Sequence, residues 1–331
     1  MKKREIIYDF IRVLSCICVI GIHSTNNLLI KSISRIGLPM FVFLSGVLIL
    51  NASEEKTSQF YFKRFIKIVI PLYLYSFFYL FVYKYNYSLN IFIPSNFMLE
   101  FVNITKGYTH YHLWYLYMIL GIYLCAPYLK KMCKNLTDRD YKNLIILIFT
   151  ITIIKYTLPN LNINIGIASI TFTDWTLVFL LGYLTTKECI NKNYKLIYFL
   201  GIIAFSFSMF ARAYIPSLTN INDLSISMML QVMAVYIFFY RNKKAICQRT
   251  KLNTIINHIS KYTFDIYLIH VFLLDIIKKQ FLNLNTNSII ISIFLIVLVF
   301  ISSYLLAIII EYIIINTFQK LIIKITNKFK K

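Results

Sequence analysis

Residues 9–27 read DFIRVLSCICVIGIHSTNN, and this stretch decides the fold class because it lies in the first of many long apolar runs. A helix over residues 7–28 would be long enough to cross the ~30 Å of hydrocarbon in a bilayer. Arg12 and His23 interrupt the run, eleven positions apart. At 100° per residue they project from one face of that helix, about 20° apart in angle and about 16 Å apart in height.

An ionisable pair inside a membrane helix points to function. A guanidinium near hydrocarbon costs at least ~2.5 kcal/mol even on lenient insertion scales, so such residues usually face a bundle interior or a water-filled cavity. We therefore expect the chemistry of this protein on the stripe that carries Arg12 and His23.

The composition extends the membrane assignment to the whole chain. Apolar residues make up 59% of the 331, and only eight Gly and six Pro interrupt them, whereas a soluble core needs less. The formal charge of +22 would also suit a nucleic-acid-binding protein. However, Lys and Arg sit in short clusters between apolar runs, as positive-inside orientation produces, and no basic tract has interleaved stacking aromatics. The sequence predicts an all-α integral membrane protein that binds membrane lipid and no nucleic acid.

A bundle of about ten transmembrane helices is predicted, with both termini on one side of the membrane. The expected spans are 7–28, 35–51, 65–84, 113–130, 143–159, 174–189, 195–214, 224–240, 262–281 and 288–313. The basic clusters all fall in the same alternate loops, so both termini are predicted to be cytoplasmic. These clusters are Lys2, Lys3 and Arg4; Lys56, Lys63, Arg64 and Lys67; Lys130, Lys131, Lys134 and Arg139; Lys187, Lys192 and Lys195; Arg241, Lys243, Lys244, Arg249 and Lys251; and the tail from Lys320 to Lys331.

Residues 1–331 are expected to form a single polytopic domain. The longest extramembrane stretch is the outer segment near 85–112, which is too short for a separate soluble domain. The start, MKKR followed by an apolar run, imitates a signal peptide, but no small-residue cleavage site follows, so we interpret it as a retained span. The six cysteines have neither metal-type nor secreted-framework spacing, so a disulfide scaffold is not expected.

Three residues of the first span form the candidate catalytic set. Asp9 and Arg12 are three positions apart, so an intrahelical ion pair would hold the guanidinium, although plain topogenic charge is an alternative. The imidazole of His23 titrates near neutral pH and can take a proton from a hydroxyl. An interfacial His satisfied by loop carbonyls is the alternative for His23.

The second and third spans supply packing and charge. Gly37 and Pro39 interrupt the start of the second span, whereas Ser45 and Gly46 are small residues that allow another helix to approach closely. Arg64 and Lys67 share a face at the cytoplasmic mouth of the third span, in position for a phosphorylated ligand. Ordinary positive-inside anchoring explains either cation alone.

The fourth span opens with His110, His112 and Trp114 at the outer interface. Trp114 suits an aromatic belt, and His112 is a candidate contact for an acceptor. A zinc site is not expected, because His110 and His112 would point to different helix faces and no carboxylate or thiol cluster is nearby. Later spans carry Asp265, His270 and Glu311, and the buried carboxylates need partners, of which Arg12 is one candidate. The sequence does not pair them.

Taken in order, these segments resemble the acyltransferase 3 family, ten-helix bacterial membrane enzymes that O-acylate cell-surface glycans. The resemblance covers nearly the whole chain. Its carriers are YDFIRVLSCICVIGIH (8–23), with the family's Arg, ten residues and His; MFVFLSGVLI (40–49); KRFIKIVIP (63–71); HLWYLYMILGIYLCAP (112–127); and YTFDIYLIH (262–270).

The resemblance implies roles for individual residues. Arg12 and His23 would be the essential pair, and Arg64 with Lys67 would line the acyl-CoA entrance. The family's Arg-x-x-Arg is here Arg64-x-x-Lys67, and lysine keeps the charge but loses bidentate phosphate geometry. HLWYL replaces the Trp-Ser-Leu-x-x-Glu segment of many polysaccharide O-acetyltransferases. This departure favours the subgroup that resembles the enterobacterial-antigen O-acetyltransferase and the proteins of poly-N-acetylglucosamine secretion.

The expected function is acyl transfer from cytoplasmic acyl-CoA, with acetyl-CoA the favoured donor, to a hydroxyl of an envelope glycan or its lipid-linked precursor. His23 would act as a general base or carry the acyl group transiently, Arg12 would orient the donor or stabilise negative charge, and Asp9 would hold Arg12. No metal is expected, and the location would be the bacterial cytoplasmic membrane. A homo-oligomer or an envelope-assembly partner stays open. A glycan exporter without covalent chemistry is the main alternative, and a sensor or scaffold with a decayed site is a weaker one.

Overall fold

The fold comes from a computed structural model, which describes residues 5–157, 174–215, 224–248, 250–280 and 285–312. In these ranges every regular element is a helix, which confirms the all-α prediction. The α-helices are α1 (Ile6–Ser24), α2 (Leu28–Ser34), α3 (Gly37–Leu50), α4 (Thr57–Arg64), α5 (Ile70–Tyr79), α6 (Pro94–Lys106), α7 (Trp114–Lys134), α8 (Asp138–Thr152), α9 (Asp174–Thr185), α10 (Glu188–Asn191), α11 (Tyr194–Tyr214), α12 (Ile226–Arg241), α13 (Lys243–Ile246), α14 (Thr250–Gln280) and α15 (Ile289–Ile310). Short π and 3-10 segments join them: η1 (Phe65–Val69), η2 (Leu80–Lys84), η3 (Leu89–Phe92), η4 (Tyr111–Leu113) and η5 (Ile153–Thr157).

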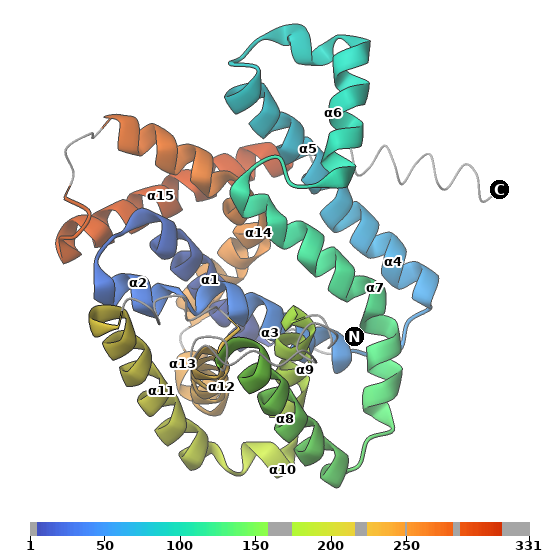
Figure 1. The fold of residues 1–331 in the computed structure, drawn as a ribbon, viewed down its shortest axis with the longest axis vertical. Helices are drawn as coiled ribbons and strands as arrows, with labels where there is room; N and C mark the ends of the chain where they lie inside the picture. The colour runs from blue at the N-terminus through green and yellow to red at the C-terminus, as the bar shows by residue number, and fades with distance from the viewer. Residues whose placement is uncertain (1–4, 158–173, 216–223, 249, 281–284, 313–331) are drawn as a thin grey trace. The chain divides into compact units, whose positions relative to one another are not determined.

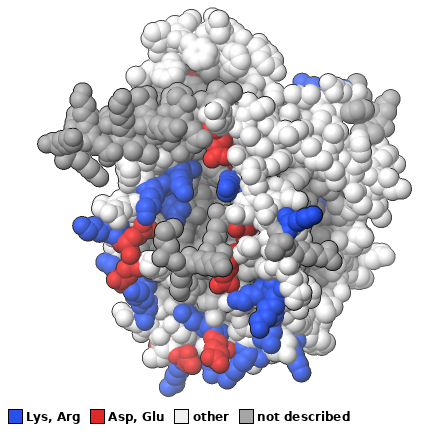
Figure 2. Space-filling view, turned by 180° about the vertical axis from the view of Figure 1, so that it is seen from behind, with Lys and Arg blue, Asp and Glu red and all other residues white. Residues whose placement is uncertain are grey.

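Each of the ten predicted spans overlaps a helix, but the span 7–28 runs past the end of α1 at Ser24 and the span 174–189 runs past the end of α9 at Thr185. By length and composition, six helical stretches in the described ranges can cross a membrane: Ile6–Ser24, Leu28–Leu50, Thr57–Lys84, Tyr111–Lys134, Tyr194–Tyr214 and Ile289–Ile310. The helices α9 and α12 are apolar but shorter. Large areas of the face in Figure 2 carry no charged side chain, as lipid-facing surfaces require.

The count of ten spans and the cytoplasmic termini stay predictions. Several residues on which they rest lie outside the described ranges. These are Lys2, Lys3, Arg4, Arg249, the tail from Lys320 to Lys331, and the predicted span ends at 158–159, 281 and 313.

The chain divides into two compact units. The first unit comprises Met1–Ala52 and Leu129–Ser302, and the second comprises Ser53–Tyr128 and Ser303–Lys331. In the first unit α1 packs against α3 and α14, α3 packs against α9, and α11 packs against α12 (Figure 1). The first helix therefore lies among others of its unit, as its ionisable residues require.

The closest helix approach in the first unit depends on two glycines. A Cβ on Gly46 of α3 would overlap the carbonyl oxygen of Phe179, and a Cβ on Gly182 of α9 would overlap that of Phe43. Pairing 46 with 179 and 43 with 182 means that α3 and α9 run antiparallel. The prediction that Gly46 permits a close helix approach is confirmed.

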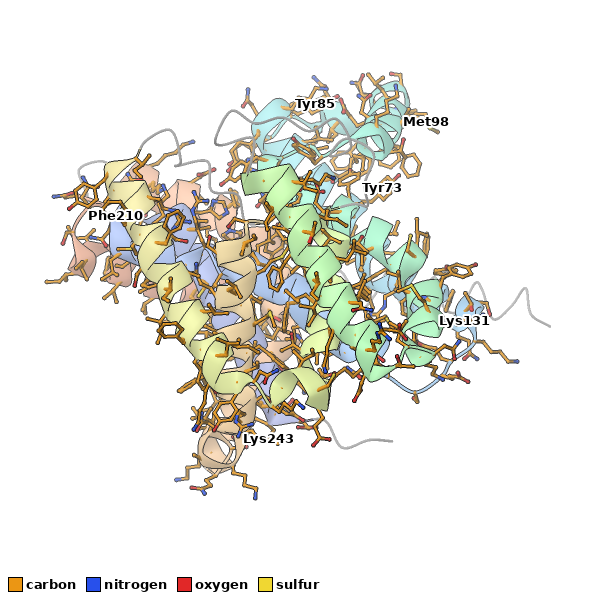
Figure 3. All side chains as sticks on the ribbon, turned by 60° about the horizontal axis from the view of Figure 1, so that its bottom comes forward. Tyr73, Tyr85, Met98, Lys131, Phe210 and Lys243 are labelled. Atoms are coloured by element: carbon orange, nitrogen blue, oxygen red, sulfur yellow. The ribbon has the colours of Figure 1, made fainter. Side chains whose placement is uncertain are left out.

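The second unit is built on the helical stretch Thr57–Lys84. Helix α6 docks on α5 through two ring stacks, Phe97 on Phe77 and Phe101 on Tyr73, each with ring centroids 4.7 Å apart. Figure 3 shows Tyr73, Tyr85 and Met98 in this region. The outer segment near 85–112 therefore holds a packed helix within the second unit.

Candidate active site

The stripe on α1 carries a fixed cation. The helix runs without a break from Ile6 to Ser24, and Arg12 Nη1 donates to Asp9 Oδ1 at 3.1 Å. Asp9 is 1% exposed and Arg12 is partly buried. The predicted intrahelical ion pair is confirmed, and it restrains the guanidinium against its own helix.

A second histidine lies beside His23. The ring of His270, on α14, has its centroid 5.4 Å from that of His23, with the planes tilted by 41°. His270 is 0% exposed, and its Nδ1 lies 2.6 Å from the carbonyl oxygen of Tyr267. Because a carbonyl only accepts hydrogen bonds, this contact assigns the proton to Nδ1 and leaves Nε2 of His270 as the acceptor nitrogen.

Residues of α14 and α15 anchor the end of α1 that carries His23. Lys278 of α14 donates to the His23 carbonyl oxygen at 2.9 Å, as suits a cation at the carbonyl end of a helix. The hydroxyls of Thr25 and the buried Ser292 share a hydrogen bond of 2.6 Å. On the opposite part of α1, the Cys16 thiol lies 3.6 Å from the Thr263 carbonyl oxygen. Helix α1 and the residue after it are thus tied to α14 and α15 by one backbone and two side-chain contacts, which favours a precisely oriented imidazole.

The second unit holds the other predicted cations. The guanidinium carbon of Arg64 lies 5.0 Å from the centroid of the Phe60 ring and 4.9 Å from that of Tyr123. Tyr61 fastens α4 to α7 beside this cage, because its hydroxyl donates to the Leu124 carbonyl oxygen at 2.8 Å. Lys67 is exposed.

A π-helical segment changes the geometry of this cation pair. The segment η1 begins at Phe65, directly after Arg64, and contains Lys67. A π-helix is wound more loosely than an α-helix, and such segments often occur at functional sites. Arg64, directly before this segment, is half-buried against rings, whereas Lys67 within it is exposed.

The structure corrects one prediction about the outer histidines. His110 and His112 do not point to different helix faces, since their Nδ1 atoms are 3.0 Å apart. The reason is that η4, a single 3-10 turn that follows the extended His110, precedes the α-helix at this point. His112 is buried against Tyr79, and Trp114 begins α7 half-buried. Within the described ranges no group of three or more His, Cys, Asp or Glu side chains could hold a metal.

Comparison with known protein families decides the class. The model of the acyltransferase domain called acyltransferase 3 matches residues 6–312. The chain belongs to the acyltransferase 3 family. No curated protein and no solved structure gives a significant match. Family membership implies an enzyme that carries out acyl transfer at the membrane.

The sequence did not predict that His270 lies beside His23 in this acyltransferase. His270 and His23 are far apart in the sequence, and a lone His in an apolar run is usually a core residue. The only available signal was the position of His270 in the YTFDIYLIH segment, where a second ionisable residue, Asp265, is also buried.

We expect Asp9→Asn to reduce acyl transfer by this acyltransferase roughly 10- to 150-fold, because a hydrogen bond to a charged group contributes about 1.5–3 kcal/mol. The amide keeps the shape of the carboxylate but removes the charge that orients Arg12. The measurement is the rate of CoA thiol release by purified protein in liposomes. Asp140→Asn is the matched control, since that carboxylate belongs to the capping box of α8. Equal rates for Asp9→Asn and wild type would contradict the assigned role.

Proposed function

We propose that this acyltransferase transfers an acetyl group from cytoplasmic acetyl-CoA to a hydroxyl of a cell-envelope polysaccharide or its lipid-linked precursor, within the cytoplasmic membrane of a bacterium. The observation that carries the proposal is the α1 stripe, where a salt-bridged Arg12 and an imidazole packed beside His270 share one anchored helix. The HLWYL segment supports the subgroup of enterobacterial-antigen and poly-N-acetylglucosamine proteins.

The proposed chemistry assigns the proton transfer to His23. Its imidazole accepts the proton of the acceptor hydroxyl as the oxygen attacks the thioester carbonyl. Collapse of the tetrahedral intermediate breaks the carbon–sulfur bond, and the CoA sulfur leaves and is protonated, so an ester and a free thiol result. Arg12 lies about 16 Å from His23 along α1 and is bonded toward Asp9, so its proposed role is to orient the donor. His270 packs its ring beside that of His23 and is proposed as a positioning residue for it.

Arg64 and Lys67 are proposed to bind the phosphates of the donor nucleotide. A guanidinium held between two rings keeps its direction, and its charge recognises phosphate. His112 and Trp114 are proposed to contact the acceptor.

We expect Arg64→Lys to raise the KM for acetyl-CoA roughly 2- to 30-fold with little change in kcat, since a cation–π contact contributes about 0.5–2 kcal/mol and lysine lacks the planar fork. Tyr123→Leu should raise KM in the same direction. Initial rates across a range of acetyl-CoA concentrations provide the measurement. Lys63→Arg is the control, because Lys63 lies outside the cage and pairs with Glu55. An unchanged KM in both cage variants would rule out a role for the cage in donor binding.

The proposed function is tested by release of CoA thiol from membranes that contain the protein. Acetyl-CoA should be consumed only in the presence of acceptor glycan, and mass spectrometry should find an ester increment on the polysaccharide that disappears when the gene is deleted. Movement of glycan across the membrane without thiol release would instead show an exporter.

A further inference from the structure

Helix α6 has apolar side chains on both its inner and its outer side. Ile104 is fully buried beside Glu100 and Asn103, which face the rest of the second unit, whereas Met98, Leu99 and Val102 are 61%, 54% and 40% exposed. A surface helix of a water-soluble segment would instead turn a polar face outward. The medium around the outer side of α6 is therefore expected to be apolar.

The inward side of α6 contributes a buried carboxylate to an ion pair with Lys84, whose side chain is 54% exposed. Glu100 is 1% exposed and accepts from Lys84 Nζ at 2.5 Å, from the Tyr85 hydroxyl at 3.0 Å and from Asn103 at 3.3 Å. Burial alone would raise the pKa of Glu100, but these hydrogen bonds outweigh it and hold the pKa of the carboxyl below its usual range. The one carboxylate in residues 85–112 is thus turned away from the outer face and neutralised.

An outer apolar face follows the segment, and Ser95 and Thr105 are exposed beside it. We use this name for the exposed side chains of Leu89, Phe92, Ile93, Met98, Leu99 and Val102. Between residues 89 and 106, Lys106 is the single charged residue besides Glu100, and it ends the helix. In a chain with 35 Lys and Arg, an aqueous loop of this length with such a surface would be an aggregation site.

Backbone groups at the end of α6 form hydrogen bonds within the protein. The Tyr117 hydroxyl lies 2.5 Å from the Ile104 carbonyl oxygen and 2.9 Å from that of Gly107. Gly107 N–H bonds to the Asn103 carbonyl oxygen at 3.2 Å. Such satisfaction of terminal carbonyls by protein groups is what a hydrocarbon environment requires.

The geometry points to lipid acyl chains as the partner of the outer apolar face. The stretches Thr57–Lys84 and Tyr111–Lys134 precede and follow α6 in the chain, and each is long and apolar enough to span a membrane. Both ends of α6 are therefore connected to membrane helices. Thirteen residues are too few to cross a bilayer. Helix α6 therefore lies within the lipid interface, with Glu100 and Asn103 turned toward the protein.

Spin labels on the outer apolar face test this inference. Met98→Cys, Leu99→Cys and Val102→Cys would each be labelled in the full chain in liposomes, with Cys125 and Cys247 replaced by serine because the other four cysteines are buried. Ile290→Cys on α15, 80% exposed in a spanning helix, is the lipid reference, and Ser53→Cys in the loop after α3 is the water reference.

The expected result is a label at positions 98, 99 and 102 that collides with oxygen more than with a water-soluble nickel chelate, as at position 290. Nickel accessibility equal to that at position 53 would overturn the inference and place α6 in water. Labels that are immobilised and reached by neither reagent would also overturn it, because a second copy or a partner protein would then cover the face. The readout needs no catalytic activity, so its outcome is independent of the proposed acyl transfer.

Discussion

Replacement of His23 by alanine is expected to lower acyl transfer by about 10²- to 10⁴-fold, the usual contribution of a positioned general base. The loss should appear in kcat, because the imidazole acts on the acceptor proton in the transition state. The measurement is acetyl-CoA-dependent thiol release by purified protein in liposomes with a glycan acceptor. The side chain is half-buried at the end of α1 and its backbone is held by Lys278, so the variant should still insert and fold.

The matched control is His258→Ala. His258 lies on α14 like His270 but is exposed and packs against Tyr262, so its loss should leave the rate unchanged. If His23→Ala retained wild-type acetylation of the acceptor, the catalytic assignment would be wrong. Incubation with acetyl-CoA alone separates the two chemical roles, because an acetylated His23 peptide would indicate an acyl carrier and its absence a general base.

The substitution Gly46→Ala should cause the largest loss of stability. A Cβ at this position would overlap the Phe179 carbonyl oxygen, which belongs to a helix backbone and cannot rotate away. Overpacking of this kind typically costs about 1–3 kcal/mol, and Gly46→Val should cost more because it is larger and branched. Thermal unfolding of purified protein in detergent, followed by circular dichroism, should show a melting temperature lower by at least about 3 °C.

Gly121→Ala is the control for the glycine prediction. Gly121 is also in a spanning helix, but a Cβ there meets nothing within 4 Å. Because Gly costs about 1 kcal/mol relative to Ala in a helix, this substitution should leave stability unchanged or raise it. Equal melting temperatures for Gly46→Ala and Gly121→Ala would mean that α3 and α9 are not held together by this contact.

Local patterns predicted the parts of the site that lie on one helix. The pairing of Asp9 with Arg12 follows from a spacing of three, and the close approach at Gly46 follows from the lack of a side chain. The pairing of His23 with His270 could not be predicted, because it depends on α1 packing against α14. The rings around Arg64 and the contact of His110 with His112 were missed for the same kind of reason: each depends on a neighbouring helix or on a 3-10 turn.

The sequence by itself determined that this protein is an all-helical membrane acyltransferase, since span length, charge placement and the ordered segments of its family are properties of consecutive residues. Only the tertiary structure decided which side of each helix is buried and which ionisable groups meet each other. Helix α6 illustrates this difference, because its one carboxylate, Glu100, is buried against Lys84 and Tyr85. A pattern of alternating character shows that a helix has two faces, but the neighbours decide which face is turned inward.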